Sequence, residues 1–118
     1  MIKADRIWLD GKLVAFEDAK VHVLTHALHY GIGVFEGIRA YEQAGGGSGV
    51  FRLREHIQRL FDSARIMLME LPFSPGDVER ACVEVLKANH LKAGYIRPLA
   101  FFGTGSMGVG APNPVQVL

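Results

Sequence analysis

The chain has 118 residues, 49% hydrophobic and 21% charged, which is typical of one globular domain with a modest core and not of a disordered chain. The formal net charge is +1 and charges of both signs are interleaved, so the sequence offers no basic stripe for nucleic acid. With one cysteine, no apolar signal peptide at the start and no stretch near the ~20 apolar residues that span a bilayer, we expect a cytoplasmic protein.

A tight hairpin is predicted near the N-terminus. Two short apolar segments, residues 6–9 and 12–14, flank Asp10-Gly11, and glycine tolerates the positive φ that such a turn requires. Residues 18–28 show no clear helical or strand period. The chain is therefore expected to start in a sheet and to pass through an ambiguous segment.

A second hairpin is predicted in a glycine-marked region. Residues 33–41 combine β-branched and aromatic side chains and predict a strand, with residues 49–52 as its partner. Between them, residues 44–49 read Ala-Gly-Gly-Gly-Ser-Gly, which resembles an interdomain linker. A linker here would leave pieces too small to fold alone, so we interpret the run as a mobile hairpin loop.

The first long helix is predicted over residues 53–69. Apolar side chains recur there at spacings of three and four, the period of an amphipathic helix, namely Ile57, Leu60, Phe61, Ala64, Met67 and Leu68. Leu71-Pro72 would end this helix, because the residue before a proline disfavours helical backbone.

A second helix is predicted from Ser74 to about residue 88. Ser74 is a preferred N-terminal capping residue, Pro75 suits the first helical position, and Asp77 places an acid in the first turn. Cys82 lies on the apolar face of this helix, so we expect it in the core.

The last part of the sequence predicts strands around a loop. Residues 95–102 are rich in β-forming side chains, and Pro98 indicates an edge or a bulge. Residues 106–114 form a glycine- and proline-rich loop, and residues 115–118 open another strand. The order of elements predicts an α+β domain in which an antiparallel sheet carries two main helices.

Chemically versatile side chains concentrate in residues 26–41. Two imidazoles, two phenols, a guanidinium and a carboxylate occur there, where a core strand would be aliphatic. The glycines Gly31, Gly33 and Gly37 allow tight turns and a close approach of a ligand to the backbone. We therefore expect a ligand to lie along this stretch.

Two groups of basic residues have simpler explanations. His22, His26 and His29 have a spacing that could present them on one helix face, but no carboxylate or cysteine completes a familiar metal set. We expect structural histidines and no metal site. The arginines of the first helix, taken by themselves, predict a solvated face: Arg52, Arg54, Arg59 and Arg65.

The chain resembles the branched-chain amino acid aminotransferases, fold type IV enzymes that use pyridoxal 5′-phosphate (PLP). The resemblance rests on residues 26–41 and on three later motifs in the family's order and nearly its spacing: Val-Phe-Arg-Leu-Arg-Glu-His-Ile-Gln-Arg-Leu (50–60), Ala-Gly-Tyr-Ile-Arg-Pro-Leu (93–99) and Gly-Ser-Met-Gly-Val (105–109). It implies that residues 1–118 are the smaller N-terminal domain, ending near an interdomain loop at about 103–114.

The resemblance also implies roles for charged and polar residues. Arg59 is similar to the arginine that grips the PLP phosphate, a role suited to the fixed donor fork of a guanidinium. Tyr95 resembles the residue that helps hold the substrate α-carboxylate, and Arg97 the one that accepts the second carboxylate of glutamate. Arg39 would have a supporting role.

Other residues resemble parts of the apolar substrate pocket. Phe35 and Tyr30 look like members of its wall, with Tyr30 reaching it from the neighbouring subunit. Met107 and Val109 lie on a loop that is similar to one crossing the dimer in this family. Gly37 fits a position of close backbone approach.

The resemblance also marks what these 118 residues lack. PLP-dependent transamination needs a lysine that holds the cofactor as a Schiff base and moves the α-proton. None of the lysines stands in a motif that matches the family's catalytic position: Lys3, Lys12, Lys20, Lys87 and Lys92. We therefore expect no catalytic residue in this chain, the Schiff-base lysine in a C-terminal domain beyond Leu118, and no turnover by the isolated piece.

The predicted function of the parent protein is transfer of an amino group between leucine, isoleucine or valine and 2-oxoglutarate, by a ping-pong mechanism through PLP in a homodimer or higher oligomer. D-amino acid aminotransferase and aminodeoxychorismate lyase share a similar Gly-Val-Phe-Glu motif, but the flanks of that motif and Tyr95-Ile96-Arg97-Pro98 favour the branched-chain enzyme. A non-catalytic dimerisation or folding module is the alternative for the isolated chain.

Overall fold

The computed structural model describes residues 4–118, and the expected α+β fold with antiparallel strands and two main helices is confirmed. The elements in chain order are β1 (Arg6–Leu9), β2 (Lys12–Ala15), the 3₁₀ helix η1 (Phe16–Asp18), α1 (His26–Tyr30), β3 (Gly33–Phe35), β4 (Ile38–Glu42), β5 (Ser48–Val50), α2 (Leu53–Ile66), α3 (Pro75–Ala88), β6 (Gly94–Ile96), β7 (Leu99–Phe102) and β8 (Val115–Val117).

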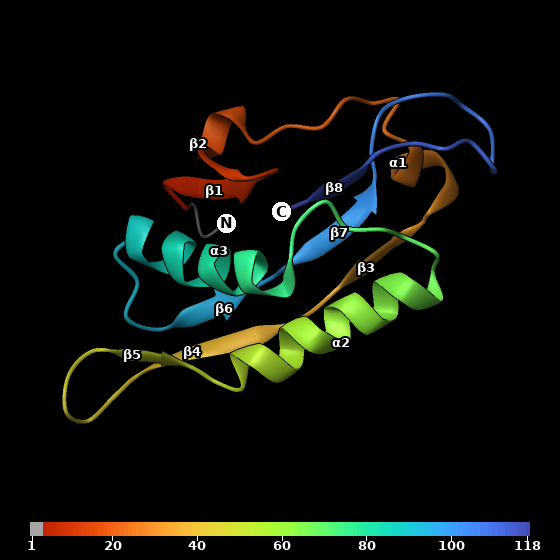
Figure 1. The fold of residues 1–118 in the computed structure, drawn as a ribbon. Helices are drawn as coiled ribbons and strands as arrows, with labels where there is room; N and C mark the ends of the chain where they lie inside the picture. Colours follow the sequence, from red (N-terminus) through yellow and green to blue (C-terminus); the bar gives the residue numbers. More distant parts are fainter. Residues whose placement is uncertain (1–3) are drawn as a thin grey trace.

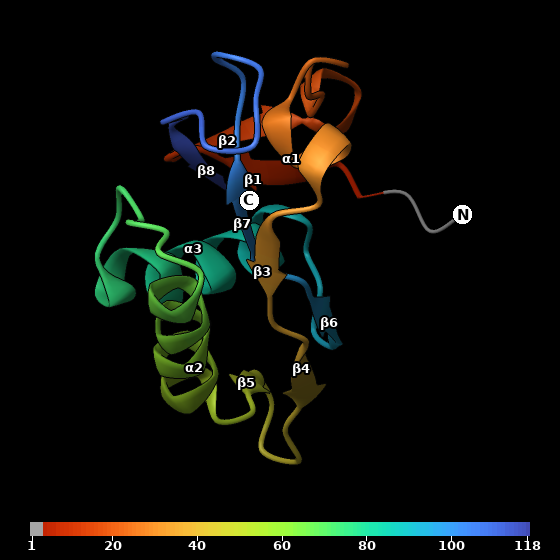
Figure 2. The same ribbon diagram turned by 90° about the vertical axis from the view of Figure 1, so that its right-hand side faces the viewer.

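The strands form three small antiparallel sheets, in the orders β1-β2, β3-β7-β8 and β5-β4-β6. The predicted N-terminal hairpin is confirmed, with Asp10 and Gly11 at φ of 45° and 91° in its turn. In Figure 1, α2 runs along β3 and β4, and α3 lies between the β1-β2 hairpin and β6. Figure 2 shows both long helices on one side of β3, β4 and β6, so the other side of these strands is left without a helix.

The strand expected over residues 33–41 is interrupted, and so is the one expected over 95–102. Both breaks lie opposite each other: Phe35 pairs with Leu99 before the break and Ile38 with Ile96 after it. Pro98 has no N–H to donate, so the ladder cannot continue through it, and only the Glu36 N–H bonds across to the Pro98 carbonyl, at 3.0 Å. At these two breaks the chain crosses between the sheet β3-β7-β8 and the sheet β5-β4-β6.

Helix α2 ends earlier than the sequence predicts. Its last residue is Ile66, and Leu68 has a φ of 54°. The Met69 N–H returns to the Ala64 carbonyl at 2.9 Å, and the Met69 side chain is 5% exposed. Met67 and Leu68, which continue the helical period in the sequence, lie after the end of the helix and are 43% and 90% exposed.

Helix α3 has the predicted bounds and start. The Ser74 hydroxyl accepts from the Asp77 N–H at 3.2 Å and the Asp77 carboxylate accepts from the Ser74 N–H at 2.8 Å, which is a capping box. The Ser74 hydroxyl, which also donates to Asp77 Oδ2 at 2.6 Å, and the Ser74 N–H hold the pKa of the Asp77 carboxyl below its usual value. The cap fixes the point at which the helix starts to cover the sheets.

The core lies between the two long helices and the inner face of the strands. Its fully buried members include Ile57 and Leu60 of α2 and Ile38 of β4, and Cys82 of α3 is 4% exposed, as expected. Trp8 of β1 meets Phe73 edge to face, with ring centroids 5.1 Å apart. No helix within residues 4–118 has the length and apolar character needed to cross a membrane.

Candidate functional site

Residues 35–37 and 95–98, which we call the strand break, carry four of the predicted substrate residues on the face that has no helix. Side chains alternate along paired strands, so Phe35, Gly37, Tyr95 and Arg97 share this face. Phe35 and Tyr95 are 58% and 56% exposed. The strand break thus brings together the residues that the sequence analysis expected in one pocket.

Arg97 joins the two aromatic rings of this face. Its guanidinium carbon stands 4.4 Å from the centroid of the Phe35 ring and 5.5 Å from that of the Tyr95 ring. Its Nη2 also donates to the Tyr95 hydroxyl at 3.1 Å. A cation over an aromatic face is attracted by the ring quadrupole, so an apolar surface and a positive charge lie side by side.

Gly37 makes room for the Tyr95 phenol. A Cβ atom at position 37 would stand 1.9 Å from the Tyr95 hydroxyl oxygen and 2.8 Å from the adjoining ring carbon. The pairing of Ile38 with Ile96, continued by one residue, brings Gly37 opposite Arg97, the hydrogen-bond partner of the Tyr95 hydroxyl. Any larger residue would therefore displace the polar groups of this face.

The opposite face of the strand break carries Glu36, which the sequence analysis did not select. Its carboxylate accepts from Arg59 twice, with Nε to Oε1 at 2.6 Å and Nη2 to Oε2 at 2.8 Å. Oε2 also lies 2.8 Å from His56 Nδ1. Since the ion pair is bidentate and Glu36 is 4% exposed, Arg59 is held in one orientation.

This ion pair shifts the pKa of both partners. The Arg59 guanidinium, followed by His56, holds the pKa of the Glu36 carboxyl below 4.5 against the opposing effect of burial. The same bonds raise the pKa of Arg59. Glu36 and Arg59 therefore form a fixed ion pair, to which His56 adds a hydrogen bond.

The other predicted residues, Tyr30, Met107 and Val109, meet at a loop. The Tyr30 hydroxyl accepts from the Gly108 N–H at 3.1 Å, and His26 Nε2 lies 2.8 Å from the Gly108 carbonyl oxygen. Met107 and Val109 are 46% and 73% exposed. The structure places Tyr30 beside this loop.

Asn113 holds the same loop from its other end. Its Oδ1 accepts from the Ser106 N–H at 2.7 Å, and its Nδ2 donates to the Ser106 carbonyl at 2.8 Å. Asn113 is 8% exposed. We call residues 104–113 the anchored loop, because polar side chains bind its backbone at Ser106 and at Gly108.

The three spaced histidines each have a local partner. His22 Nδ1 accepts from the Leu24 N–H at 3.1 Å, and His29 Nε2 lies 2.8 Å from the Val23 carbonyl oxygen. His26 packs on Tyr30, with ring centroids 4.5 Å apart. Among residues 4–118, no three His, Cys, Asp or Glu side chains are grouped so as to hold a metal ion.

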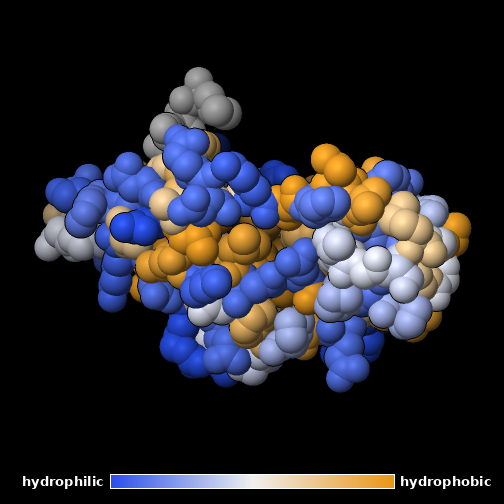
Figure 3. Space-filling view, turned by 90° about the horizontal axis from the view of Figure 1, so that it is seen from above, coloured by the Kyte–Doolittle hydropathy of each residue, from blue (hydrophilic) through white to orange (hydrophobic). Residues whose placement is uncertain are grey.

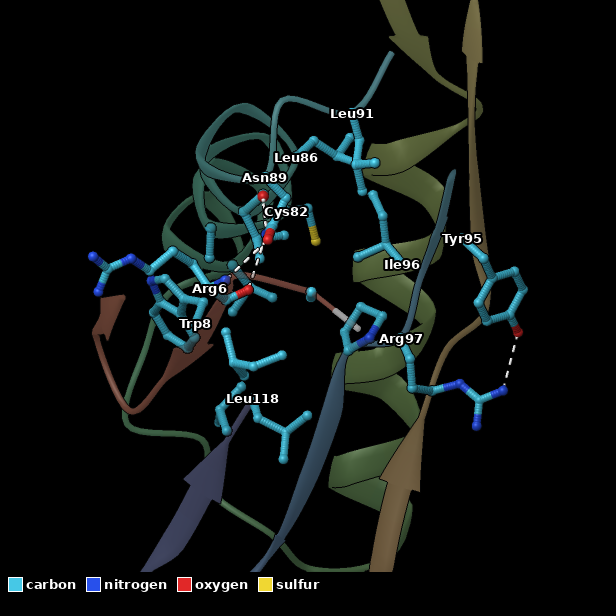
Figure 4. A pocket seen from close by; sticks show the side chains of 17 residues that line it. Arg6, Trp8, Cys82, Leu86, Asn89, Leu91, Tyr95, Ile96, Arg97 and Leu118 are labelled. Atoms are coloured by element: carbon cyan, nitrogen blue, oxygen red, sulfur yellow. Dashed lines mark hydrogen bonds between the residues drawn. The ribbon is translucent and has the colours of Figure 1, made fainter. Parts of the chain in front are cut away.

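A cavity of about 280 Å³ lies between α3, β1 and β6. Figure 4 shows Cys82, Leu86 and Leu118 around it, whereas the Tyr95 phenol and the Arg97 guanidinium point to the other side of β6. Burial raises the pKa of the Cys82 thiol to about 12, so the thiol is neutral there. This apolar cavity lies behind the strand break and shares residues 95–98 with it.

Exposed apolar side chains surround the approach to α1. The segment 21–28 exposes four of them, Val21, Val23, Leu24 and Leu28, between 44% and 73%. Figure 3 shows apolar surface among polar side chains on the face seen from above, which carries β1, β2 and the chain leading to α1. Several large apolar side chains exposed close together in one segment favour an interaction site.

Glu36 and Asn113 could have been found from the sequence. Alternation places Glu36 on the same face as Val34 and Ile38, and a carboxylate among buried aliphatic residues needs a cation. Asn113 gave a weaker signal, because asparagine is common in loops for several reasons. His26 was noticed, but the loop it binds is 82 residues away in the chain.

The comparisons with known proteins agree with this architecture. The family model described as amino-transferase class IV matches residues 33–118. Relatives named branched-chain-amino-acid aminotransferase include one from Pseudomonas aeruginosa, 50% identical over 94% of this chain, and one from Escherichia coli K12, 53% identical over 93%. The chain spans 37% and 35% of these two proteins, so it corresponds to little more than a third of their length.

Solved structures give the same result. The T.th. branched-chain amino acid aminotransferase complexed with N-(5′-phosphopyridoxyl)-L-glutamate is 50% identical, with a TM-score of 0.94 over 99% of this chain and 40% of that one. The complex of the same enzyme with 4-methylvaleric acid has a TM-score of 0.95. Because the family model covers well over half of the residues and the fold agrees, the chain belongs to the class IV aminotransferase family.

Proposed function

We propose that the protein containing this chain is a PLP-dependent aminotransferase that moves an amino group between a branched-chain L-amino acid and 2-oxoglutarate. Identity of 50–53% to enzymes of that name over more than nine tenths of the chain supports the proposal. One of the similar structures holds a phosphopyridoxyl adduct of glutamate and another holds 4-methylvaleric acid, which has a branched apolar end.

One observation carries the choice of substrates, the juxtaposition of Arg97 with Phe35. Leucine needs an apolar surface, while the second carboxylate of glutamate needs a cation when water is removed. Phe35 offers the first and Arg97, 4.4 Å above its ring, offers the second. In this proposal Tyr95 binds the α-carboxylate of either substrate and Gly37 allows both to approach the backbone.

The residues present also fit the phosphate of PLP. Arg59 is 68% exposed at its side chain, although Glu36 holds it in place, so part of its guanidinium faces outward. In this proposal Arg59 binds the cofactor phosphate. PLP, when bound, supplies the electron sink that allows the α-proton of the amino acid to be moved.

The remaining parts of the site are proposed to come from elsewhere. The Schiff-base lysine lies in a C-terminal domain that follows the loop at about 103–114. A second copy of the chain supplies Tyr30, Met107 and Val109 to the pocket, which accords with the exposed apolar side chains of segment 21–28. The single cysteine accords with a cytoplasmic location.

The test is made with the full-length protein. Leucine and 2-oxoglutarate should yield glutamate and 4-methyl-2-oxopentanoate, and borohydride reduction followed by mass spectrometry should leave a phosphopyridoxyl group on one lysine. D-alanine should replace leucine poorly. Turnover with D-alanine and none with leucine would favour the D-amino acid aminotransferase, and lyase activity on aminodeoxychorismate would favour the third member of this family.

A further inference from the structure

Glu36 occupies a position where a carboxylate is costly. It shares the inner face of β3 and β4 with Val34 and Ile38, which are 8% and 0% exposed. Burying a charge without partners costs several kcal/mol, on the order of the whole stability of a small domain. An apolar residue could be buried here at a lower cost in free energy. The hydrogen-bond partners of Glu36 therefore indicate why a carboxylate occupies this position.

Those partners come from a single face of α2. His56 and Arg59 are three residues apart and therefore neighbours on the helix surface. Together they give the Glu36 carboxylate three hydrogen bonds, two of them from Arg59. His56 binds Oε2, so the carboxylate itself cannot rotate away from the guanidinium.

The geometry uses only one edge of the Arg59 guanidinium. This group has five N–H donors in one plane, and Glu36 takes the Nε–H and one Nη2–H. Within residues 4–118, no acceptor is bound to the two Nη1–H groups or to the second Nη2–H. The free edge is therefore a second fork, and it matches two oxygens of a phosphate.

We propose that Glu36 is a positioning residue for the cofactor phosphate: it grips the side edge of Arg59 so that the end edge is presented, already oriented, to the phosphate group. His56 supports Glu36 in the same role. The inference rests on the proposed function, since it assumes that the anion bound by Arg59 is the phosphate of PLP. It assigns Glu36 no part in the proton transfer.

If Glu36 instead competed with the phosphate for Arg59, removing its charge would change the affinity for phosphate in the opposite direction. A carboxylate beside Arg59 neutralises its charge, and a competitor for the guanidinium would weaken anion binding. Positioning predicts that removing the charge of Glu36 weakens phosphate binding, because a flexible arginine must lose side-chain freedom on binding. Competition predicts tighter binding.

The experiment measures binding of PLP and of pyridoxal, which has no phosphate, to the full-length apoprotein by absorbance titration. Glu36→Gln keeps the shape of the side chain but puts an N–H donor against the guanidinium. We expect about a ten-fold rise in the Kd for PLP, by analogy with residues that orient metal ligands, and no change in the Kd for pyridoxal. Glu55→Gln is the matched control, because Glu55 also pairs with an arginine next to α2 but is 58% exposed.

A double-mutant cycle separates positioning from a general structural effect. In an Arg59→Ala background, Glu36→Gln should change the Kd for PLP by less than about two-fold, because nothing is left to position. Equal losses for PLP and pyridoxal would overturn the inference and indicate a structural role. So would tighter PLP binding by Glu36→Gln, or an unchanged Kd.

The same titrations distinguish failure of the inference from failure of the proposed function. If the parent protein binds no PLP, both are wrong. The positioning role alone is wrong in a different case. There the full-length protein binds PLP and Arg59→Ala loses the preference for PLP over pyridoxal, but Glu36→Gln binds PLP as tightly as the unsubstituted protein does. Should Glu36→Gln not fold, His56→Ala replaces it, with an expected rise of about three-fold in the Kd for PLP alone, and no rise would contradict the inference.

Discussion

The strand break and the anchored loop are both proposed to meet substrate, but the structure holds them by different means. At the strand break, charged groups are fixed by other charged groups and by rings, as with Arg97 over Phe35 and Arg59 on Glu36. The anchored loop is held by the polar side chains of Asn113, His26 and Tyr30, which bind its backbone. The charged contacts of the strand break suit the recognition of a charged substrate group. The polar contacts of the anchored loop suit a pocket wall that selects a substrate by its shape.

Replacement of Arg97 should separate the two substrates most strongly. We expect Arg97→Ala in the full-length enzyme to lower kcat/KM for glutamate by about 100-fold, because a buried carboxylate loses its cation, and for leucine by only a few-fold. Steady-state kinetics with both substrates measure this. Arg97→Lys, which keeps the charge, should recover part of the glutamate activity, and equal losses for both substrates would contradict the division of roles.

Gly37→Ala should affect both substrates alike, because it acts on Tyr95. The new Cβ would meet the Tyr95 hydroxyl at 1.9 Å, so the phenol must move away from Arg97. We expect about a ten-fold loss of kcat/KM for leucine and for glutamate, with a melting temperature close to that of the parent because Tyr95 is exposed. Gly45→Ala, in open space within the hairpin loop, is the control. A loss confined to one substrate would place Tyr95 elsewhere in the pocket.

Asn113→Ala should loosen the anchored loop and leave the strand break intact. The change leaves the N–H and C=O of Ser106 without their partner, at a cost of about 1–3 kcal/mol. Limited proteolysis should cut residues 104–113 faster, and the KM for leucine should rise several-fold while the Kd for PLP stays unchanged. Weaker PLP binding would mean that the two regions are coupled.

Acid should weaken the ion pair between Glu36 and Arg59 behind the strand break. The pKa of Glu36 is lowered in the folded protein, chiefly by Arg59, so its contribution to stability is present above the ordinary value of about 4.5 and is lost as the pH falls through the lowered value. Between about pH 5 and pH 3 the melting temperature of the parent should fall slightly more than that of Glu36→Gln. Parallel curves would mean that the ion pair adds nothing to stability.

Local signals predicted some elements well. Ser74, Pro75 and Asp77 fix the start of α3 through contacts within four residues, so their effect can be read from neighbouring positions. The interruption at residues 36–37 depends on Pro98, which lies across the ladder, so residues 33–41 alone predict one continuous strand. The early end of α2 has no signal in the sequence, because Met67 and Leu68 continue the apolar period although both are exposed beyond the helix.

The candidate site, too, is predicted where its signals are local and missed where the partners of a residue are distant in the sequence. Phe35, Gly37, Tyr95 and Arg97 were selected on a resemblance, and strand alternation then brings them to one face. Their roles remain predictions. Glu36 was missed because it was considered as one carboxylate in a rich motif and not as the single charge on a buried face, and its partners lie 20 and 23 residues further along the chain.

The turn of the first hairpin has a consequence for synthesis of the chain. Asp10 accepts from the Val117 N–H at 2.8 Å and from Gln116 Nε2 at 2.7 Å, and its own N–H donates to the Val117 carbonyl at 2.9 Å. During translation, residues 6–15 leave the ribosome long before these partners exist. The β1-β2 hairpin therefore lacks these three hydrogen bonds until about a hundred more residues have been added.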